Sequence, residues 1–198
     1  LPIIGRAVAR QSGVIAARVN GAVVSVRVQV GDRVGPGHVL LVQDDSLKRA
    51  ELSRYVAEIA VQRAKLSTAQ AKLELAAQEM SRLSALESSA ALPKARFEDQ
   101  RQEMVRFRSG VQEARAQLAR AKANKHIGEI GLERTTVKAI YPGVILHRHT
   151  SPGAFLRAGD AIVTMLNDRK MELEVDVPTD RLPGLAVGSS VGFKTQTQ

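Results

Sequence analysis

Residues 21–42 read GAVVSVRVQVGDRVGPGHVLLV, and a run of the same shape returns at residues 143–164 as GVILHRHTSPGAFLRAGDAIVT. A shift of 122 residues places the first run on the second without a gap. The shift superposes three pairs of glycines: Gly21 and Gly143, Gly31 and Gly153, Gly37 and Gly159. Because glycine adopts positive φ without steric cost, we expect each pair to make the same turn. The chain therefore carries one small β unit twice.

Each copy of the unit has the pattern of short strands. Val23, Val26, Val28 and Val30 lie among polar residues, and Gly-Asp and Gly-Pro-Gly mark turns. One copy of about 30 residues could hardly enclose a core, whereas two copies related by a pseudo-twofold axis could. We therefore expect a β-sandwich split into residues 13–45 and residues 135–168.

Residues 46–134, between the two copies, are rich in Ala, Leu, Gln, Lys, Arg and Glu, which favour helices. Apolar residues recur every seven positions on both sides of a break at residues 86–93, where Pro93 suits the first turn of a returning helix. This pattern predicts an antiparallel coiled-coil hairpin about 60 Å long. Its predicted core consists of Leu52, Ile59, Leu66, Leu73 and Met80 in the first helix, and Phe97, Met104, Val111 and Leu118 in the second.

The composition excludes several classes of site and argues against others. The chain has no cysteine, which excludes disulfides, thiolate zinc sites and cysteine nucleophiles. Its net charge is +9, but the basic residues alternate with acidic ones and aromatics are only 3%, so we expect no nucleic-acid partner. No stretch reaches the ~20 apolar residues of a membrane span. Because the chain begins abruptly at Leu1, we expect that a targeting segment has been removed.

The split repeat around a heptad hairpin resembles the periplasmic adaptor, or membrane fusion, proteins (HlyD- and AcrA-like) of bacterial tripartite efflux and secretion systems. The resemblance rests on residues 21–41 and 132–166 together with the inserted hairpin. It implies an α+β fold in which the sandwich is lipoyl-like and the hairpin is inserted into it. It also implies that residues 1–12 and 169–198 form part of a β-barrel domain.

The resemblance implies a function as well. The chain would be a hexameric, non-enzymatic adaptor in the periplasm, anchored to the inner membrane by a segment absent here. It would link an inner-membrane transporter to a TolC-type outer-membrane channel, and the transporter would most readily be of the resistance-nodulation-division (RND) type. An ATP-driven (ABC) exporter or type I secretion system is the alternative partner.

Residues near the hairpin tip resemble the channel-docking motif of that family, Arg-x3-Leu-x6-Ser. Arg82 and Leu86 occupy the Arg and Leu positions, and Pro93 stands in the place of Ser. Proline can begin a helix but has no hydroxyl group. We therefore expect docking at the tip, with altered detail around Pro93.

Other candidate sites receive plainer interpretations. His147 and His149 form a His-x-His pair that could begin a metal site with His38, but zinc needs four ligands and we expect a solvated strand face. The glycine-rich turn at residues 31–37 lacks the Gly-Lys-Ser/Thr ending of a phosphate loop. We expect no metal, cofactor or catalytic residue.

Three carboxylates and two lysines complete the candidates. Asp44, Asp45 and Asp168 follow apolar strands, and we expect turn and capping roles for them, with Asp45 or Ser46 capping the first helix. A lipoyl or biotinyl carrier, the remote alternative function, would need a lysine on a tight hairpin between the two halves. Lys48 and Lys138 only flank that junction. The junctions at residues 43–47 and 132–137 are expected hinges.

Overall fold

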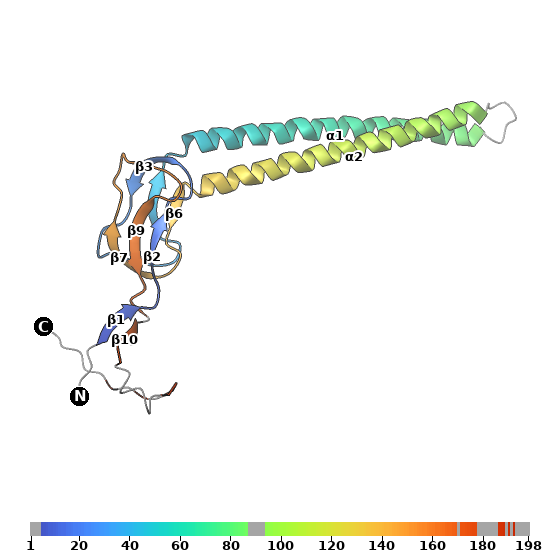
Figure 1. Ribbon diagram of the computed structural model, residues 1–198. Coiled ribbons are helices and arrows are strands. Elements are labelled where there is room, and N and C mark those ends of the chain that lie inside the picture. The colour runs from blue at the N-terminus through green and yellow to red at the C-terminus, as the bar shows by residue number, and fades with distance from the viewer. Residues whose placement is uncertain are drawn as a thin grey trace.

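The computed structural model describes residues 5–86, 94–169, 171–177, 186–188, 190 and 192. Two long helices, α1 (Ser46–Leu86) and α2 (Lys94–Glu133), leave one end of a β-sandwich as an antiparallel pair, and the strands β1 and β10 lie beyond its other end (Figure 1). The strands are β1 (Gly5–Ala9), β2 (Ser12–Ala16), β3 (Gly21–Val26), β4 (Arg33–Val34), β5 (Val39–Gln43), β6 (Thr136–Lys138), β7 (Gly143–Arg148), β8 (Phe155–Leu156), β9 (Ala161–Leu166) and β10 (Met171–Val175).

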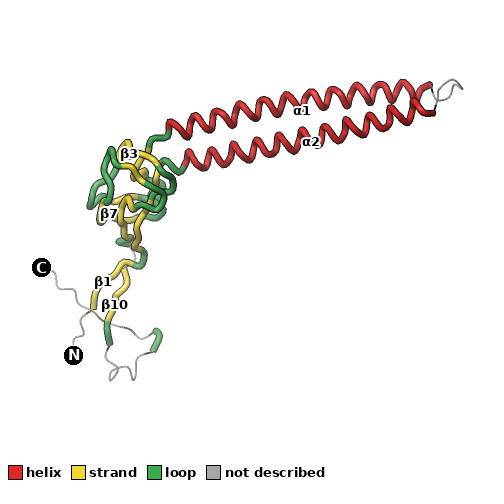
Figure 2. The backbone as a smooth tube through the Cα atoms, turned by 45° about the horizontal axis from the view of Figure 1, so that its top comes forward, coloured by secondary structure: helices red, strands yellow, loops and turns green. Residues whose placement is uncertain are grey.

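The sandwich consists of two four-stranded sheets, with strand orders β2-β9-β7-β4 and β6-β5-β3-β8. Each sheet takes strands from both sides of the hairpin. The tube drawing shows the strands of the sandwich gathered at the base of the two helices (Figure 2). The 122-residue shift carries β3 onto β7, β4 onto β8 and β5 onto most of β9, so the two sheets are copies of one another. The predicted α+β fold class is confirmed.

The core of the sandwich obeys the same repeat. Apolar residues that the shift superposes are buried in both halves, with exposed fractions of 8% or less. The buried pairs are Ile15 and Val137, Ala17 and Ala139, Val23 and Ile145, Val34 and Leu156, Leu40 and Ile162, and Leu41 and Val163.

Hydrogen bonds between the halves are repeated too. Gly31 N–H donates to Ile145 O at 2.8 Å, and its counterpart Gly153 N–H donates to Val23 O at 2.9 Å. These reciprocal bonds and the shared core hold residues 12–43 against residues 136–166, so neither half can separate without exposing apolar surface.

The six repeat glycines act in two different ways. Gly31, Gly37, Gly153 and Gly159 have φ between 82° and 101°, as the turns require. Gly21 and Gly143 instead begin β3 and β7 without positive φ, so the expectation of a left-handed turn at these two positions is wrong. Gly143 is needed for a different reason: an added Cβ would lie 2.2 Å from Leu166 O of β9.

The repeat also explains two buried polar side chains, Gln43 and Thr150. Their counterparts are the buried apolar residues Met165 and Val28. Among the described residues, Gln43 Oε1 and Thr150 Oγ1 are the buried side-chain atoms without a hydrogen-bond partner. Gln43 Nε2 still donates to Val19 O at 3.1 Å, whereas the Thr150 hydroxyl gains nothing from burial.

Thr150→Val, which copies the repeat partner, is therefore expected to raise the free energy of unfolding by about 1 kcal/mol, because an unpaired buried hydroxyl costs free energy that a methyl group of equal size does not. The reciprocal variant Val28→Thr should lower it by a similar amount. Thermal melting of both variants checks the prediction. Equal melting temperatures for Thr150→Val and Val28→Thr would contradict it.

The two helices pack along the predicted heptad rows. All nine predicted core residues are half-buried or buried among exposed neighbours, and Val111 is only 3% exposed. A second row contributes small residues and a leucine to the contact, with Ala76, Leu83 and Ala121 buried. Gln100 Nε2 donates to Ala76 O across the pair at 3.4 Å, which joins α2 to α1 near the far end of the hairpin.

The base of the hairpin is closed by Tyr55, whose ring fills the space left by Gly128. A Cβ at Gly128 would lie 2.9 Å from Tyr55 Cδ2 and 3.1 Å from Cε2. Tyr55 O–H donates to Glu51 Oε1 at 3.1 Å, and Lys48 Nζ donates to Glu51 Oε2 at 3.1 Å. The hydroxyl group of Tyr55 is thus bound to Glu51, which Lys48 holds in turn.

Gly128→Ala and Gly110→Ala should therefore change the stability of the hairpin in opposite directions. Alanine normally stabilises a helix by about 1 kcal/mol relative to glycine, and nothing lies within 4 Å of a Cβ built at Gly110. Gly110→Ala should raise the melting temperature of the helical circular-dichroism signal, whereas Gly128→Ala should lower it because the methyl group displaces Tyr55. A stabilising Gly128→Ala would contradict the packing of the base.

Strands β1 and β10 form a separate two-stranded antiparallel sheet, in which Gly5 pairs with Val175 and Ala9 with Met171. Arg6 Nη2 and Glu174 Oε2 form an ion pair across it at 2.9 Å. Both strands belong to the segments predicted for the barrel, residues 1–12 and 169–198. Most of residues 178–198 lie outside the described residues, so the barrel stays a prediction.

Candidate functional site

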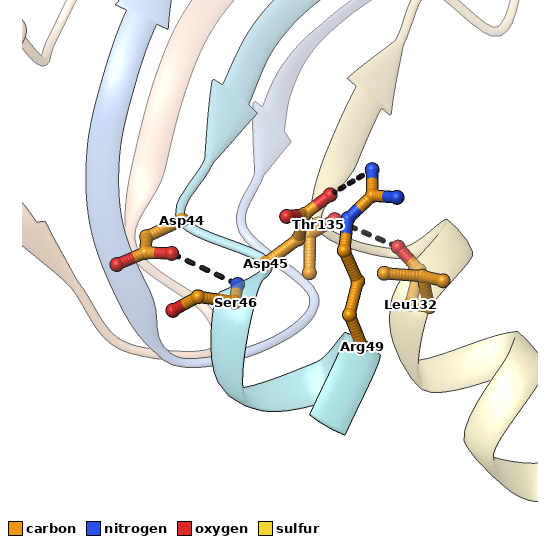
Figure 3. Close-up of polar contacts among 6 residues, drawn as sticks. All are labelled: Asp44, Asp45, Ser46, Arg49, Leu132 and Thr135. Carbon is orange, nitrogen blue, oxygen red and sulfur yellow. Dashed lines mark hydrogen bonds and ion pairs between the residues drawn. The ribbon is translucent and has the colours of Figure 1, made fainter. Parts of the chain in front are cut away.

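The chain enters the hairpin at residues 44–49, where a side-chain cap and an ion pair hold the start of α1 (Figure 3). Asp44 Oδ1 accepts a hydrogen bond from Ser46 N–H at 2.9 Å, and Asp45 Oδ2 pairs with Arg49 Nη2 at 2.7 Å. Arg49 N–H also donates to the backbone oxygen of Asp45 at 2.8 Å. The expected capping role is therefore filled by the Asp44 side chain, while the carboxylate of Asp45 neutralises Arg49.

The chain leaves the hairpin through a second tie, at Thr135. Its hydroxyl donates to Leu132 O at 2.7 Å, closing the last turn of α2 (Figure 3). Gln43 N–H donates to Thr135 O at 2.9 Å, which links the end of β5, where the chain enters the hairpin, to the segment before β6, where it leaves. Thr135 is 2% exposed. Both expected hinges, residues 43–47 and 132–137, are thus bridged by hydrogen bonds, and their role as hinges stays a prediction.

The carboxylates at the entry have lowered pKa values. The Ser46 backbone N–H lowers the pKa of Asp44, and the hydrogen bond from Arg49 lowers the pKa of Asp45. Because the pKa of each folded carboxyl lies below its unfolded value, their stabilisation is present above about pH 4 and is lost as pH falls through the folded pKa values.

Ser46→Pro tests the cause of the shift at Asp44. Proline suits the first helical position but has neither an N–H nor a hydroxyl to donate, and the backbone and the side chain of Ser46 both lower the pKa of Asp44. We therefore expect α1 to persist while the pKa of Asp44 rises toward its ordinary value. Side-chain carboxyl titration by NMR measures this, and the pKa of Asp45 serves as the internal control. An unchanged pKa at Asp44 would show that the backbone N–H is not its cause.

Two of the three predicted docking residues, Arg82 and Leu86, lie at the far end of α1. Arg82 is in the last turns of α1, where its exposed guanidinium pairs with Glu79. Leu86 is the last residue of α1, and its side chain is outside the described residues. Pro93 is outside them altogether. Channel docking through Arg82, Leu86 and Pro93 therefore stays a prediction.

The histidine pair lies on β7 and the loop that follows it. The rings of His147 and His149 have centroids 6.3 Å apart, and His149 Nε2 lies 2.8 Å from Thr164 Oγ1. Both residues are exposed. Within the described part of the chain, no group of three or more His, Asp or Glu side chains is placed to hold a metal ion.

The remaining candidates have structural positions. Lys48 lies in the first turn of α1 and pairs with Glu51, and Lys138 is an exposed residue of β6. Asp168 Oδ2 pairs with Arg33 Nη2 of β4 at 2.8 Å, joining the two halves of the sandwich. Neither lysine is on a tight hairpin between strands. None of the described helices is long and apolar enough to cross a membrane.

Known proteins with the same arrangement identify the fold. MacA from Actinobacillus actinomycetemcomitans matches with a TM-score of 0.84 and 17% identity, over 91% of this chain and 57% of MacA. The membrane fusion protein Spr0693 from Streptococcus pneumoniae R6 matches with a TM-score of 0.52 and 17% identity, over 93% of this chain and 71% of that one. The chain has the fold of the membrane fusion proteins. The resemblance inferred from the repeat and the hairpin is confirmed.

The chain is also similar in sequence to a curated protein. Nodulation protein NolF from Rhizobium meliloti (strain 1021) is 25% identical over 197 residues, covering 96% of this chain and 48% of NolF. No protein-family model matches the chain. The chain thus spans about half the length of NolF and 57% of MacA.

Proposed function

We propose that this chain is the central part of a periplasmic adaptor in an efflux or secretion system. The observation that carries the proposal is the hairpin: two helices of 41 and 40 residues project from the sandwich on the side opposite β1 and β10 (Figure 1). At 1.5 Å per residue such a hairpin reaches about 60 Å. A rigid arm of this length suits a protein that connects partners in two different membranes.

The proposed partners follow from the two ends of the molecule. The hairpin tip around Arg82, Leu86 and Pro93 docks on a TolC-type outer-membrane channel. The β1–β10 end faces an inner-membrane transporter of the RND type, near the anchor that holds the full-length protein to that membrane. An ABC exporter is the alternative transporter. The protein itself supplies packing and leverage rather than catalysis.

Self-association, with six copies in a ring, completes the proposal. Contact between neighbouring copies is supported by a hollow of about 680 Å³ between the sandwich and the base of α2, lined by Val14, Ile130 and Ile140 among others. Val14 and Ile140 are 55% and 62% exposed, which is high for large apolar side chains. A neighbouring copy packed here would cover both side chains.

Affinity purification of the full-length protein from detergent-solubilised membranes tests the transporter assignment. We expect an RND transporter to co-purify, and recovery of an ATPase-containing exporter instead would establish the alternative.

Intact mass measurement addresses the carrier function. An added lipoyl or biotinyl group would contradict the adaptor assignment, and an unmodified mass from a cell able to add both would exclude a carrier.

A further inference from the structure

The middle of the hairpin is far more basic than its ends. Residues 59–73 and 104–122 contain eight cations and a single acidic residue, Glu113. All eight cations are exposed, and within the described residues none of them forms an ion pair. We call this set the basic belt: Arg63, Lys65, Lys72, Arg106, Arg108, Arg115, Arg120 and Lys122.

An apolar groove lies within the basic belt. Its volume is about 620 Å³, and small residues of both helices, including Ala64, Ala69 and Gly110, leave the space open. Phe107 contributes to its lining, and three belt residues, Lys65, Lys72 and Arg106, line it as well. Large apolar side chains are exposed nearby, with Val61 in the groove at 48% and the neighbouring Val105 at 58%.

We propose that this groove binds an amphipathic helix of another protein, with apolar residues facing Phe107 and acidic residues facing the basic belt. The site is distinct from the hairpin tip and extends the proposed adaptor function without depending on it.

The shape of the groove favours a helix. Its α1 wall extends from Val61 to Lys72, about 17 Å or three helical turns at 1.5 Å per residue. A third helix laid between two antiparallel helices can bury one apolar stripe against both of them. The half-buried heptad rows of an isolated pair leave room for such a contact.

The charge of the groove selects the partner. In a ring, a neighbouring copy would present a different face of its hairpin, but residues 59–73 and 104–122 contain only one acidic residue on any face. Contact between the middles of two hairpins would therefore bring like charges together, which is unfavourable. Acidic side chains flanking an apolar stripe would instead pair with Lys65, Lys72 and Arg106. The occupant is therefore acidic, and it is not this chain.

Two labelled 18-residue helical peptides test the proposal by fluorescence anisotropy with the 198-residue chain. Both carry one leucine stripe, flanked by glutamates in the first peptide and by lysines in the second. We expect the acidic peptide to bind at least tenfold more tightly than the basic one, with an affinity that falls as salt is added.

Two matched variants locate the binding. Thr68→Glu places a negative charge in the groove, whereas Gln70→Glu makes the same change two residues along α1, outside the groove lining. We expect Thr68→Glu to weaken the acidic peptide at least tenfold and Gln70→Glu to leave it within twofold. Circular dichroism verifies the helix content of both, and Lys65→Ala with Lys72→Ala provides a second test that preserves the helix.

Four results would overturn the proposal. Equal binding of the two peptides would show that the basic belt does not select charge. Equal effects of Thr68→Glu and Gln70→Glu would show that the groove is not the site. A dimer seen by sedimentation and abolished by Thr68→Glu would assign the face to a second copy. Binding to anionic phospholipid vesicles without binding to the acidic peptide would assign it to a membrane.

Discussion

Gly143→Ala is expected to lower the free energy of unfolding of the sandwich by at least about 3 kcal/mol, because the new Cβ would lie 2.2 Å from Leu166 O and 2.9 Å from Leu166 C. Both atoms are backbone, so relief requires β7 and β9 to move apart. β7 pairs with β9 through four residue pairs, and Tyr141 O–H also donates to Met165 O at 3.1 Å. Loss of this contact should loosen the centre of one sheet.

Gly21→Ala is the matched control, since the repeat places Gly21 on Gly143. A Cβ at Gly21 would lie 3.5 Å from Gln43 Cβ, an ordinary contact, and the variant should cost less than about 1 kcal/mol. Hydrogen exchange of the β7 and β9 amides and thermal melting distinguish the two variants. Equal protection and equal melting temperatures would contradict the close approach of β7 to β9.

Val111→Asp is expected to disrupt the hairpin, lowering its stability by at least about 3 kcal/mol. Val111 is the most buried apolar residue of the two helices at 3% exposed, and a carboxylate there would lose its water without gaining a partner. Leu66→Asp should act in the same direction with a smaller effect, because Leu66 is only half-buried. The melting of the helical circular-dichroism signal reports both.

Gln112→Asp is the control for Val111→Asp. It introduces the same side chain at the next position of α2, which is exposed, and should shift the melting temperature by only a few degrees. If Val111→Asp melted like Gln112→Asp, the heptad row would not form the contact between the helices.

The sequence alone predicted the sandwich and the hairpin because both are repeats. Paired glycines at Gly31 and Gly153 specify the same local turn, and a seven-residue period specifies one helix face. Such features depend on neighbours in the chain, so their meaning does not require knowledge of the tertiary structure.

Features that depend on tertiary contacts were either predicted wrongly or missed. Gly143 is needed because of Leu166, which approaches it only once β7 and β9 pair. The cap of α1 is the side chain of Asp44 rather than that of Asp45 or Ser46. The space at Gly128 that the Tyr55 ring fills depends on the register of the two helices.

The expectation that basic and acidic residues alternate along the whole chain is wrong for residues 59–73 and 104–122, where eight cations accompany one acidic residue. The overall charge of +9 spreads over a chain in which acidic residues are also frequent. Only the antiparallel register brings residues 59–73 beside residues 104–122 and places Lys72 and Arg106 on one groove. Counting charge separately for each third of the hairpin would have detected the basic belt.

Cysteine crosslinking in intact cells tests the adaptor assignment most directly, since the chain has no native cysteine. Ser84→Cys places a thiol near the tip and keeps the proposed docking residues, and Leu47→Cys places one at the base of the same helix, where Leu47 is 77% exposed. With a short thiol crosslinker and the full-length protein, Ser84→Cys should capture an outer-membrane channel and Leu47→Cys should not. Capture by Ser84→Cys of only other copies of the protein, at normal expression, would contradict docking at the tip.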